Sequence, residues 1–132
     1  MWPFRRRGSI GQQGEELAVK YLRRAGHKVL ARNYRCPLGE ADVITLDSST
    51  KAELGSASLV FVEVKTRSSD EYASPESAVD RRKQQKLIRV ARYYLAHHDV
   101  GEYPVRFDVV AVLLVPGGKG EVRHIVDAFR PG

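Results

Sequence analysis

Cysteine is nearly absent from the sequence, and so are long apolar runs. The single residue Cys36 cannot form a disulfide within the chain, which favours a reducing, cytoplasmic location. The arginines at positions 5–7 are not followed by the roughly 7–15 apolar residues of a signal peptide. No stretch approaches the roughly 18 apolar residues that span a bilayer. We therefore expect a cytoplasmic protein that does not enter the membrane.

Acidic residues are fewer than basic ones. The 132-residue chain has 16 Asp and Glu against 22 Lys and Arg, a formal net charge of +6. This excess favours polyanionic partners, because each phosphate contact releases bound counterions. With 42% hydrophobic and 29% charged residues, the composition is that of one folded domain, for which about 100–150 residues is the usual size.

The pattern of apolar residues predicts a helix, three strands, a second helix and two final strands. The first helix covers residues 12–25 and ends at Gly26. Strands are predicted over 28–34, 40–46, 59–66, 105–115 and 121–128, and the second helix runs from Pro75 to His97. Residues 47–58 are expected to form an exposed hairpin connection, and residues 1–10 a flexible basic arm. This order predicts a single α/β domain with a mixed central sheet flanked by helices.

Two of the predicted strands carry charged residues among apolar ones. In VFVEVK, side chains alternate between the faces of the strand, so Glu63 and Lys65 share one face. In GEADVITL, Asp42 has apolar neighbours in the same way. Charges on a covered strand cost free energy unless they are paired or bind a metal. Two interpretations stay open: an ion pair of Lys65 with Glu63 or Asp42, and a metal site.

A metal site of this composition suits the hydrolysis of phosphodiesters. Carboxylate oxygens hold Mg²⁺ or Mn²⁺, and Asp42 and Glu63 are the candidate ligands. The metal lowers the pKa of a water molecule and neutralises charge on the scissile phosphate. Lys65 would orient this water or stabilise the transition state. The residues therefore favour a nuclease among the enzyme classes.

Several segments of the sequence resemble successive blocks of the YraN family of bacterial proteins: GQQGEELAVKYL, RNYRCPLGEADVI, FVEVKTR, ESAVDRRKQQKL and VRFDVVAV. That family resembles archaeal Holliday-junction resolvases within the PD-(D/E)XK nuclease superfamily. The resemblance implies a restriction-endonuclease-like core over residues 11–130, a divalent metal and a nucleic-acid substrate. One departure from the superfamily motif is Ala41, which stands where a proline would precede Asp42.

The resemblance also implies a metal-facing glutamate in the first helix, where the sequence offers Glu15 and Glu16. At about 100° per residue, Glu15 lies near the border of the apolar stripe and Glu16 lies almost opposite it. The implied catalytic set is therefore Glu15, Asp42, Glu63 and Lys65, with the three carboxylates as metal ligands. The alternative for Glu15 is a first-turn glutamate that complements the helix dipole.

The second predicted helix is strongly basic. Lys83 and Lys86 are candidates for contacts with backbone phosphates, and Gln84 for the rim of the metal site. Arg67, which follows the strand that carries Lys65, belongs to the same nucleic-acid-binding set. The alternative is a solvated helix face without a ligand.

Asp108, His27 and His124 have structural interpretations. Asp108 shares a strand face with Arg106, and an ion pair between them is expected rather than a metal ligand. His27 and His124 have no partners at ligand spacing along the sequence.

The resulting hypothesis is a Mg²⁺- or Mn²⁺-dependent endonuclease that hydrolyses DNA, with branched DNA as a candidate substrate. A catalytically inactive nucleic-acid-binding module is the alternative, and a protein of RNA processing is a weaker one. The sequence leaves the oligomeric state open, with a homodimer as one option.

Overall fold

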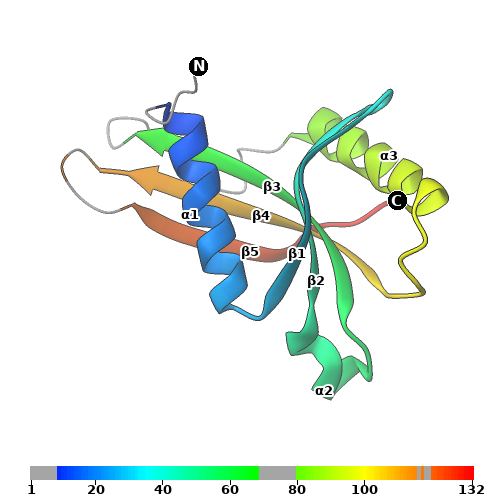
Figure 1. Ribbon diagram of the computed structural model, residues 1–132. Coiled ribbons are helices and arrows are strands. Elements are labelled where there is room, and N and C mark those ends of the chain that lie inside the picture. The colour runs from blue at the N-terminus through cyan, green and yellow to red at the C-terminus, as the bar shows by residue number, and fades with distance from the viewer. Residues whose placement is uncertain (1–8, 69–79, 116, 118–119) are drawn as a thin grey trace.

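Five strands form the centre of the computed structural model, which describes residues 9–68, 80–115, 117 and 120–132 (Figure 1). The elements in chain order are α1 (Ile10–Arg24), β1 (His27–Cys36), β2 (Gly39–Asp47), η1 (Ser48–Thr50), α2 (Lys51–Leu54), β3 (Ser58–Ser68), α3 (Arg81–His97), β4 (Val105–Leu114) and β5 (Glu121–Phe129). The sheet has the order β1-β2-β3-β4-β5, and only the β3–β4 pair is parallel. The predicted fold class, an α/β restriction-endonuclease-like core with a mixed sheet, is confirmed.

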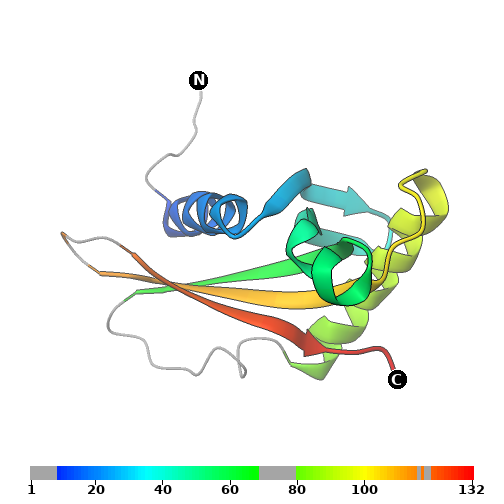
Figure 2. The ribbon, with the colours of Figure 1, turned by 90° about the horizontal axis from the view of Figure 1, so that it is seen from below.

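The helices α1 and α3 pack against the sheet (Figure 2). Two apolar layers separate them from it, one beneath α1 and one beneath α3. The α1 layer consists of Ala18, Val19, Leu22, Val43, Val60, Val62, Val110 and Val112. The α3 layer consists of Ala41, Ile44, Leu59, Phe61, Leu87, Ile88, Val90, Ala91, Tyr94 and Phe107. Burial of each such Val, Leu, Ile or Phe side chain contributes roughly 1.5–3 kcal/mol to folding. On β3, even-numbered residues face α1 and odd-numbered residues face α3, which is the predicted alternation.

The start of α1 lies against β3. The helix is capped by Ser9, whose side-chain oxygen accepts a 3.0 Å hydrogen bond from the backbone N–H of Gln12. At Gly14 the helix contacts Thr66 so closely that a Cβ atom at this position would overlap the threonine side chain. Only glycine permits this approach, and it brings the next residue, Glu15, to the sheet.

Residues 47–58 join the antiparallel strands β2 and β3, as the expected exposed hairpin connection does, and they also contain the short helices η1 and α2. The Asp47 carboxylate accepts the backbone N–H of Ser49 and so starts a helical turn. The helix α3 starts later than expected, because Asp80 is in an extended conformation and caps it by accepting the N–H of Lys83. Pro75, the expected start, lies outside the described residues.

Other element boundaries agree with the predictions to within a few residues. Gly26 has a φ of 98°, the left-handed conformation that glycine adopts after a helix end. Of the predicted basic arm, only Ser9 and Ile10 are described, and they begin α1. No helix in the described part of the chain is both long enough and apolar enough to cross a membrane.

Candidate functional site

The strands β2 and β3 separate at the point where the predicted acidic residues stand. Their ladder stops at the Val43–Val62 pair, and the next residues are Asp42 and Glu63. Beyond this point β3 stays paired with β4 up to Ser68, the last residue of β3. Because the sheet is open here, side chains from α1 on one face and from α3 on the other can approach the same place.

Asp42 is held across this opening by β3. Its Oδ2 accepts a 2.8 Å hydrogen bond from the backbone N–H of Val64, while Oδ1 accepts none from the described residues. Burial raises the pKa of Asp42 above its usual value, and the negative charges of Glu15 and Glu40 raise it further, against the lowering effects of the Val64 N–H and of Lys65. The carboxylate therefore has one tethered oxygen and one oxygen that is available to a ligand.

Glu63 faces the same opening without a stabilising partner. Within the described part of the chain, its carboxylate accepts no hydrogen bond and forms no ion pair. Burial raises the pKa of Glu63 to about 7, and the charge of Asp42 adds to this effect, whereas Lys65 and Lys83 lower the pKa. Two carboxylates that are both hard to ionise form a site in which a cation would be stabilised.

Lys65 lies two residues beyond Glu63 but does not neutralise it. Among the described residues, no carboxylate oxygen is within 4.0 Å of the lysine nitrogen. Lys83 at the start of α3 contributes most to lowering the pKa of Lys65, followed by burial. The self-contained ion pair, one of the two interpretations of the sequence, is therefore not observed, and two neighbouring ammonium groups instead favour an anion.

Glu15 reaches the opening from α1. Its side chain is 17% exposed, against 69% for Glu16, as the helical wheel predicted. The negative charge of Glu15 acts on Asp42, so the two carboxylates are electrostatic neighbours. The helix-dipole alternative does not apply, because α1 begins at Ile10 and its first turn contains no acidic residue.

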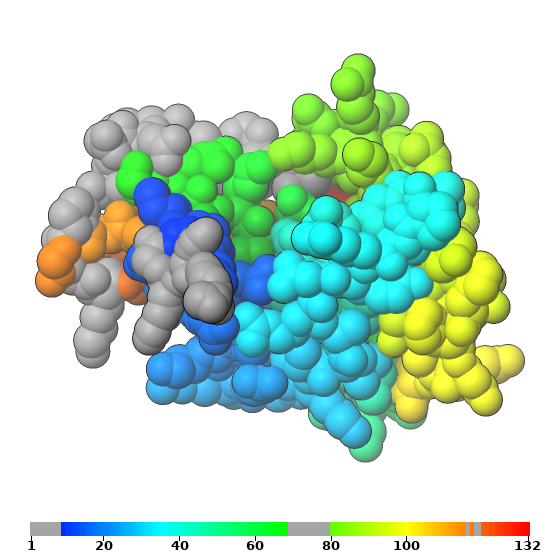
Figure 3. All heavy atoms as spheres, turned by 45° about the horizontal axis from the view of Figure 1, so that its top comes forward, coloured from blue at the N-terminus to red at the C-terminus, as the bar shows by residue number. Residues whose placement is uncertain are grey.

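The predicted nucleic-acid-binding residues lie beside this site. All charged residues of α3 are basic: Arg81, Arg82, Lys83, Lys86, Arg89 and Arg92. Lys83 and Lys86 are exposed, whereas Gln84 and Arg67 are half-buried. Gly39 packs against the aliphatic part of Lys86, which places the start of α3 against the β1–β2 turn. In the space-filling view, β3 reaches the surface between α1 and the β1–β2 hairpin (Figure 3).

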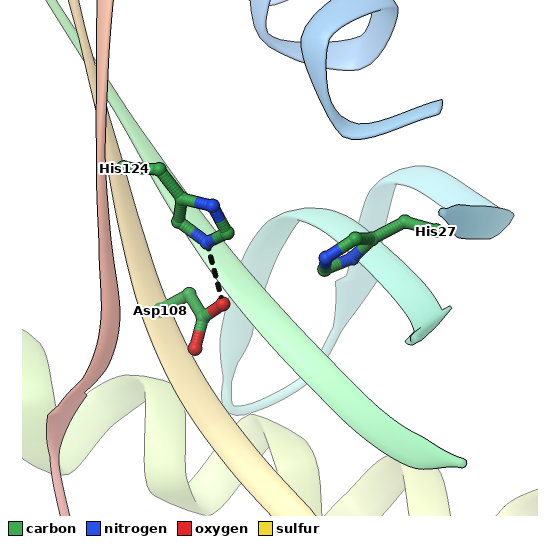
Figure 4. A group of neighbouring side chains, drawn as sticks. All are labelled: His27, Asp108 and His124. Carbon is green, nitrogen blue, oxygen red and sulfur yellow. Dashed lines mark hydrogen bonds and ion pairs between the residues drawn. The ribbon is translucent and has the colours of Figure 1, made fainter. Parts of the chain in front are cut away.

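A second polar cluster lies at the other end of the sheet, and the sequence predicted only its Arg106–Asp108 pair. Ligand atoms of His27, Asp108 and His124 lie within 4.8 Å of one another (Figure 4). The His124 Nε2 is 2.7 Å from Asp108 Oδ2, and His27 Nδ1 is 2.6 Å from the hydroxyl of Thr45. The one signal in the sequence was an aspartate among the apolar residues of a predicted strand. Asp108 is fully buried in the structure, where such a charge must be paired.

This second cluster is better explained as a structural network than as a metal site. As predicted, Arg106 pairs with Asp108, donating through Nε to Oδ1 and through Nη2 to Oδ2, each at 2.9 Å. Arg106 Nη2 also donates to Asp47 Oδ2 at 2.9 Å. A metal ion here would face the guanidinium and would displace the bond between His124 and Asp108. The network joins β1, β2, β4 and β5.

The fold and the cluster of Glu15, Asp42, Glu63 and Lys65 define an α/β protein with a restriction-endonuclease-like core and acidic residues at the opening between β2 and β3. The profile of Uncharacterised protein family UPF0102 matches residues 14–112, and the chain belongs to this family. This confirms the resemblance to the YraN family, which is the same group.

Relatives match over most of the chain. The UPF0102 protein of Caldanaerobacter subterraneus subsp. tengcongensis is 39% identical over 123 residues, covering 92% of this chain and 94% of that protein. The UPF0102 protein of Beutenbergia cavernae is 44% identical over 122 residues, covering 92% of this chain and 97% of its own length. The UPF0102 protein of Syntrophus aciditrophicus is 43% identical over 119 residues, covering 90% of this chain and 87% of that protein.

Proposed function

We propose that this protein is a Mg²⁺- or Mn²⁺-dependent endonuclease that hydrolyses phosphodiester bonds in DNA, with branched DNA as a candidate substrate. The observation that carries the proposal is the site at the β2–β3 opening. There, Asp42 and Glu63 are partly buried carboxylates with raised pKa values and no neutralising ion pair among the described residues, and Lys65 stands next to them.

The donor atoms fit a hard divalent cation. Such ions take oxygen ligands from carboxylates. Asp42 Oδ1 and the Glu63 carboxylate accept no hydrogen bond from the described residues. Glu15, whose negative charge acts on Asp42, adds a third carboxylate. We assign Asp42, Glu63 and Glu15 as the residues that hold the ion. When bound, the metal lowers the pKa of the attacking water and neutralises charge on the phosphate.

The lysines of the site have a different role from the carboxylates. We assign Lys65 to the scissile phosphate, where its ammonium stabilises the negative charge that develops in the transition state. Lys83 lies beside Lys65, and its charge acts on both Lys65 and Glu63. Lys83 is therefore placed to bind a phosphate of the same strand, next to the one that reacts.

The basic helix α3 provides the proposed DNA-binding surface. Lys83 and Lys86 contact backbone phosphates, with Gln84 and Arg67 at the rim of the site. Contacts of this kind are independent of sequence, so the substrate would be selected by shape rather than by bases. A cytoplasmic location and the option of a homodimer stay predictions from the sequence.

Cleavage of defined nucleic acids tests the proposal. End-labelled four-way DNA junctions, linear duplexes and RNA of matched length would be incubated with wild type, Lys65→Ala and Asp42→Ala in Mg²⁺ or Mn²⁺. We expect the wild type to cut the DNA junction, and both variants to lose about 10²-fold or more of this rate. Lys65→Ala should still bind Mn²⁺, since the lysine holds phosphate charge rather than metal.

The outcomes separate the function classes. DNA binding without cleavage by the wild type would favour the inactive binding module. Cleavage that persists unchanged in both variants would show that the activity arises from another site or from a contaminating nuclease.

A further inference from the structure

Asn33 on β1 occupies an unusual position beside the candidate site. The pairs Arg32–Val43 and Tyr34–Ala41 place it opposite Asp42 in the β1–β2 ladder. Its φ is 51°, a left-handed conformation that asparagine tolerates better than most residues other than glycine. An extended strand does not require this conformation, and in it the side chain of Asn33 reaches Glu15 on α1.

The amide of Asn33 binds one oxygen of Glu15. Its Nδ2 donates to Glu15 Oε1 at 3.0 Å, and Arg32 Nη2 donates to the same oxygen at 3.2 Å. Oε2 of Glu15 accepts no hydrogen bond from the described residues. The carboxylate is thus fixed through Oε1, while Oε2 is left for another ligand, in the same way that Asp42 is fixed through Oδ2.

We propose that Asn33 is a positioning residue of the metal site: its side-chain amide fixes Glu15 Oε1 and thereby presents Oε2 to the cation that Asp42 and Glu63 hold. This inference rests on the proposed function, because it requires a cation at the β2–β3 opening. Outer-shell partners that orient ligands in this way typically change metal affinity by about 10–100-fold when they are removed.

Arg32 does not replace Asn33 in this role. Its Nη2 is shared between Glu15 and Glu16, with a 3.0 Å bond to Glu16 Oε2, and its side chain is 33% exposed. Both residues are exposed, but the arginine side chain has more rotatable bonds than the short side chain of Asn33 and therefore more rotamers. The amide is also neutral, so it orients the carboxylate without adding a positive charge that would compete with a cation.

Calorimetric titration with Mn²⁺ alone tests this role in the full chain, without substrate. Asn33→Gly keeps the left-handed backbone accessible and removes only the amide. Asn33→Ala also removes the amide and adds no charge beside Glu15. We expect the Mn²⁺ dissociation constant to rise about 10-fold or more in each variant. Two variants keep the test informative if one of them folds poorly.

A double variant gives the readout that a merely structural role would not produce. If Asn33 acts through Glu15, Asn33→Gly should have no further effect on Mn²⁺ affinity once Glu15→Gln is present. Additive effects, or wild-type affinity in both Asn33 variants, would overturn the positioning role while leaving the proposed function intact. If the wild type binds no Mn²⁺, both the proposed function and the positioning role of Asn33 are overturned. The wild-type titration shows this outcome before any Asn33 variant is measured.

Discussion

The Asp42 carboxylate on β2 accepts a 2.8 Å hydrogen bond from the backbone N–H of Val64 on β3, just beyond the last β2–β3 ladder pair. This bond continues the connection between the strands where backbone pairing has ended. Asp42 therefore has two separable properties: an acceptor oxygen that supports the fold, and a negative charge that burial makes unfavourable.

Two substitutions of Asp42 separate these properties in metal-free protein. Asp42→Asn keeps an oxygen that can accept the Val64 N–H and removes the charge, so we expect a melting temperature equal to or above that of the wild type. Asp42→Ala removes the acceptor as well, and should be about 1–3 kcal/mol less stable than Asp42→Asn. Chemical denaturation of both variants measures the difference. Equal stability of the two would show that the hydrogen bond to Val64 contributes nothing.

Glu63 should make the stability of metal-free protein depend on pH. Its pKa is raised from 4.5 to about 7, so the protonated form stabilises the fold fully below pH 4.5, and this contribution is lost as the pH rises through about 7. Glu63→Gln should therefore raise the melting temperature by about 2–6 °C more at about pH 8 than at about pH 4. Thermal melts at both pH values measure this. A gain that is the same at both would contradict the shifted pKa.

His27 should act in the opposite pH direction. Burial lowers the pKa of its imidazole below 6.5, against the raising effect of Asp47. The other charged or titratable groups that face the ring are Asp108, Arg106 and His124. A depressed pKa gives stability that is present above pH 6.5 and is lost as the pH falls through the folded-state value.

The measurement is urea denaturation of the wild type and His27→Gln. The variant cannot titrate at this position but keeps a polar side chain. Its deficit in unfolding free energy should be largest at about pH 7.5 and should shrink as the pH falls to about 5. A deficit that stays constant would show that His27 does not titrate in this range.

The basic helix should determine how DNA binding depends on salt. If Lys83 and Lys86 each contact a phosphate, log affinity falls with log salt by about 0.9 per contact, and replacing both by alanine should flatten the slope by up to about two units. The double variant of Arg23 and Arg24, at the far end of α1, removes the same charge and is the matched control. It should leave the slope nearly unchanged. Equal changes in the two double variants would place the DNA elsewhere.

The sequence predicted the sheet well because strands depend on local patterns, and the same patterns nominated the residues of the candidate site, whose role stays a prediction. Alternating apolar residues defined the strands, and charges on covered strands singled out Asp42, Glu63 and Lys65. The choice of Glu15 over Glu16 followed from the helical wheel. The positions that these residues occupy at the opening between two strands required the structure, because strand separation is not encoded in either strand alone.

Other features depend on contacts that no local pattern records. The two histidines of the buried network are 97 residues apart in the chain, and only the complete sheet brings them together. Likewise, nothing in the sequence distinguishes Asn33 from its neighbours in the strand. Its left-handed backbone and its place opposite Asp42 are known only from the structure. The predicted start of α3 was too early, because the helix begins at Arg81, after Asp80 caps it.

A Mn²⁺ titration of the wild type and Asp42→Asn, without nucleic acid, tests the central claim most directly. The two proteins differ in one charge and share the acceptor for Val64, so a difference in affinity reports on the metal and not on the fold. We predict that the wild type binds Mn²⁺ and that Asp42→Asn binds it more than about 10-fold more weakly. Equal binding by the two proteins, or no binding by the wild type, would contradict a metal site at the β2–β3 opening.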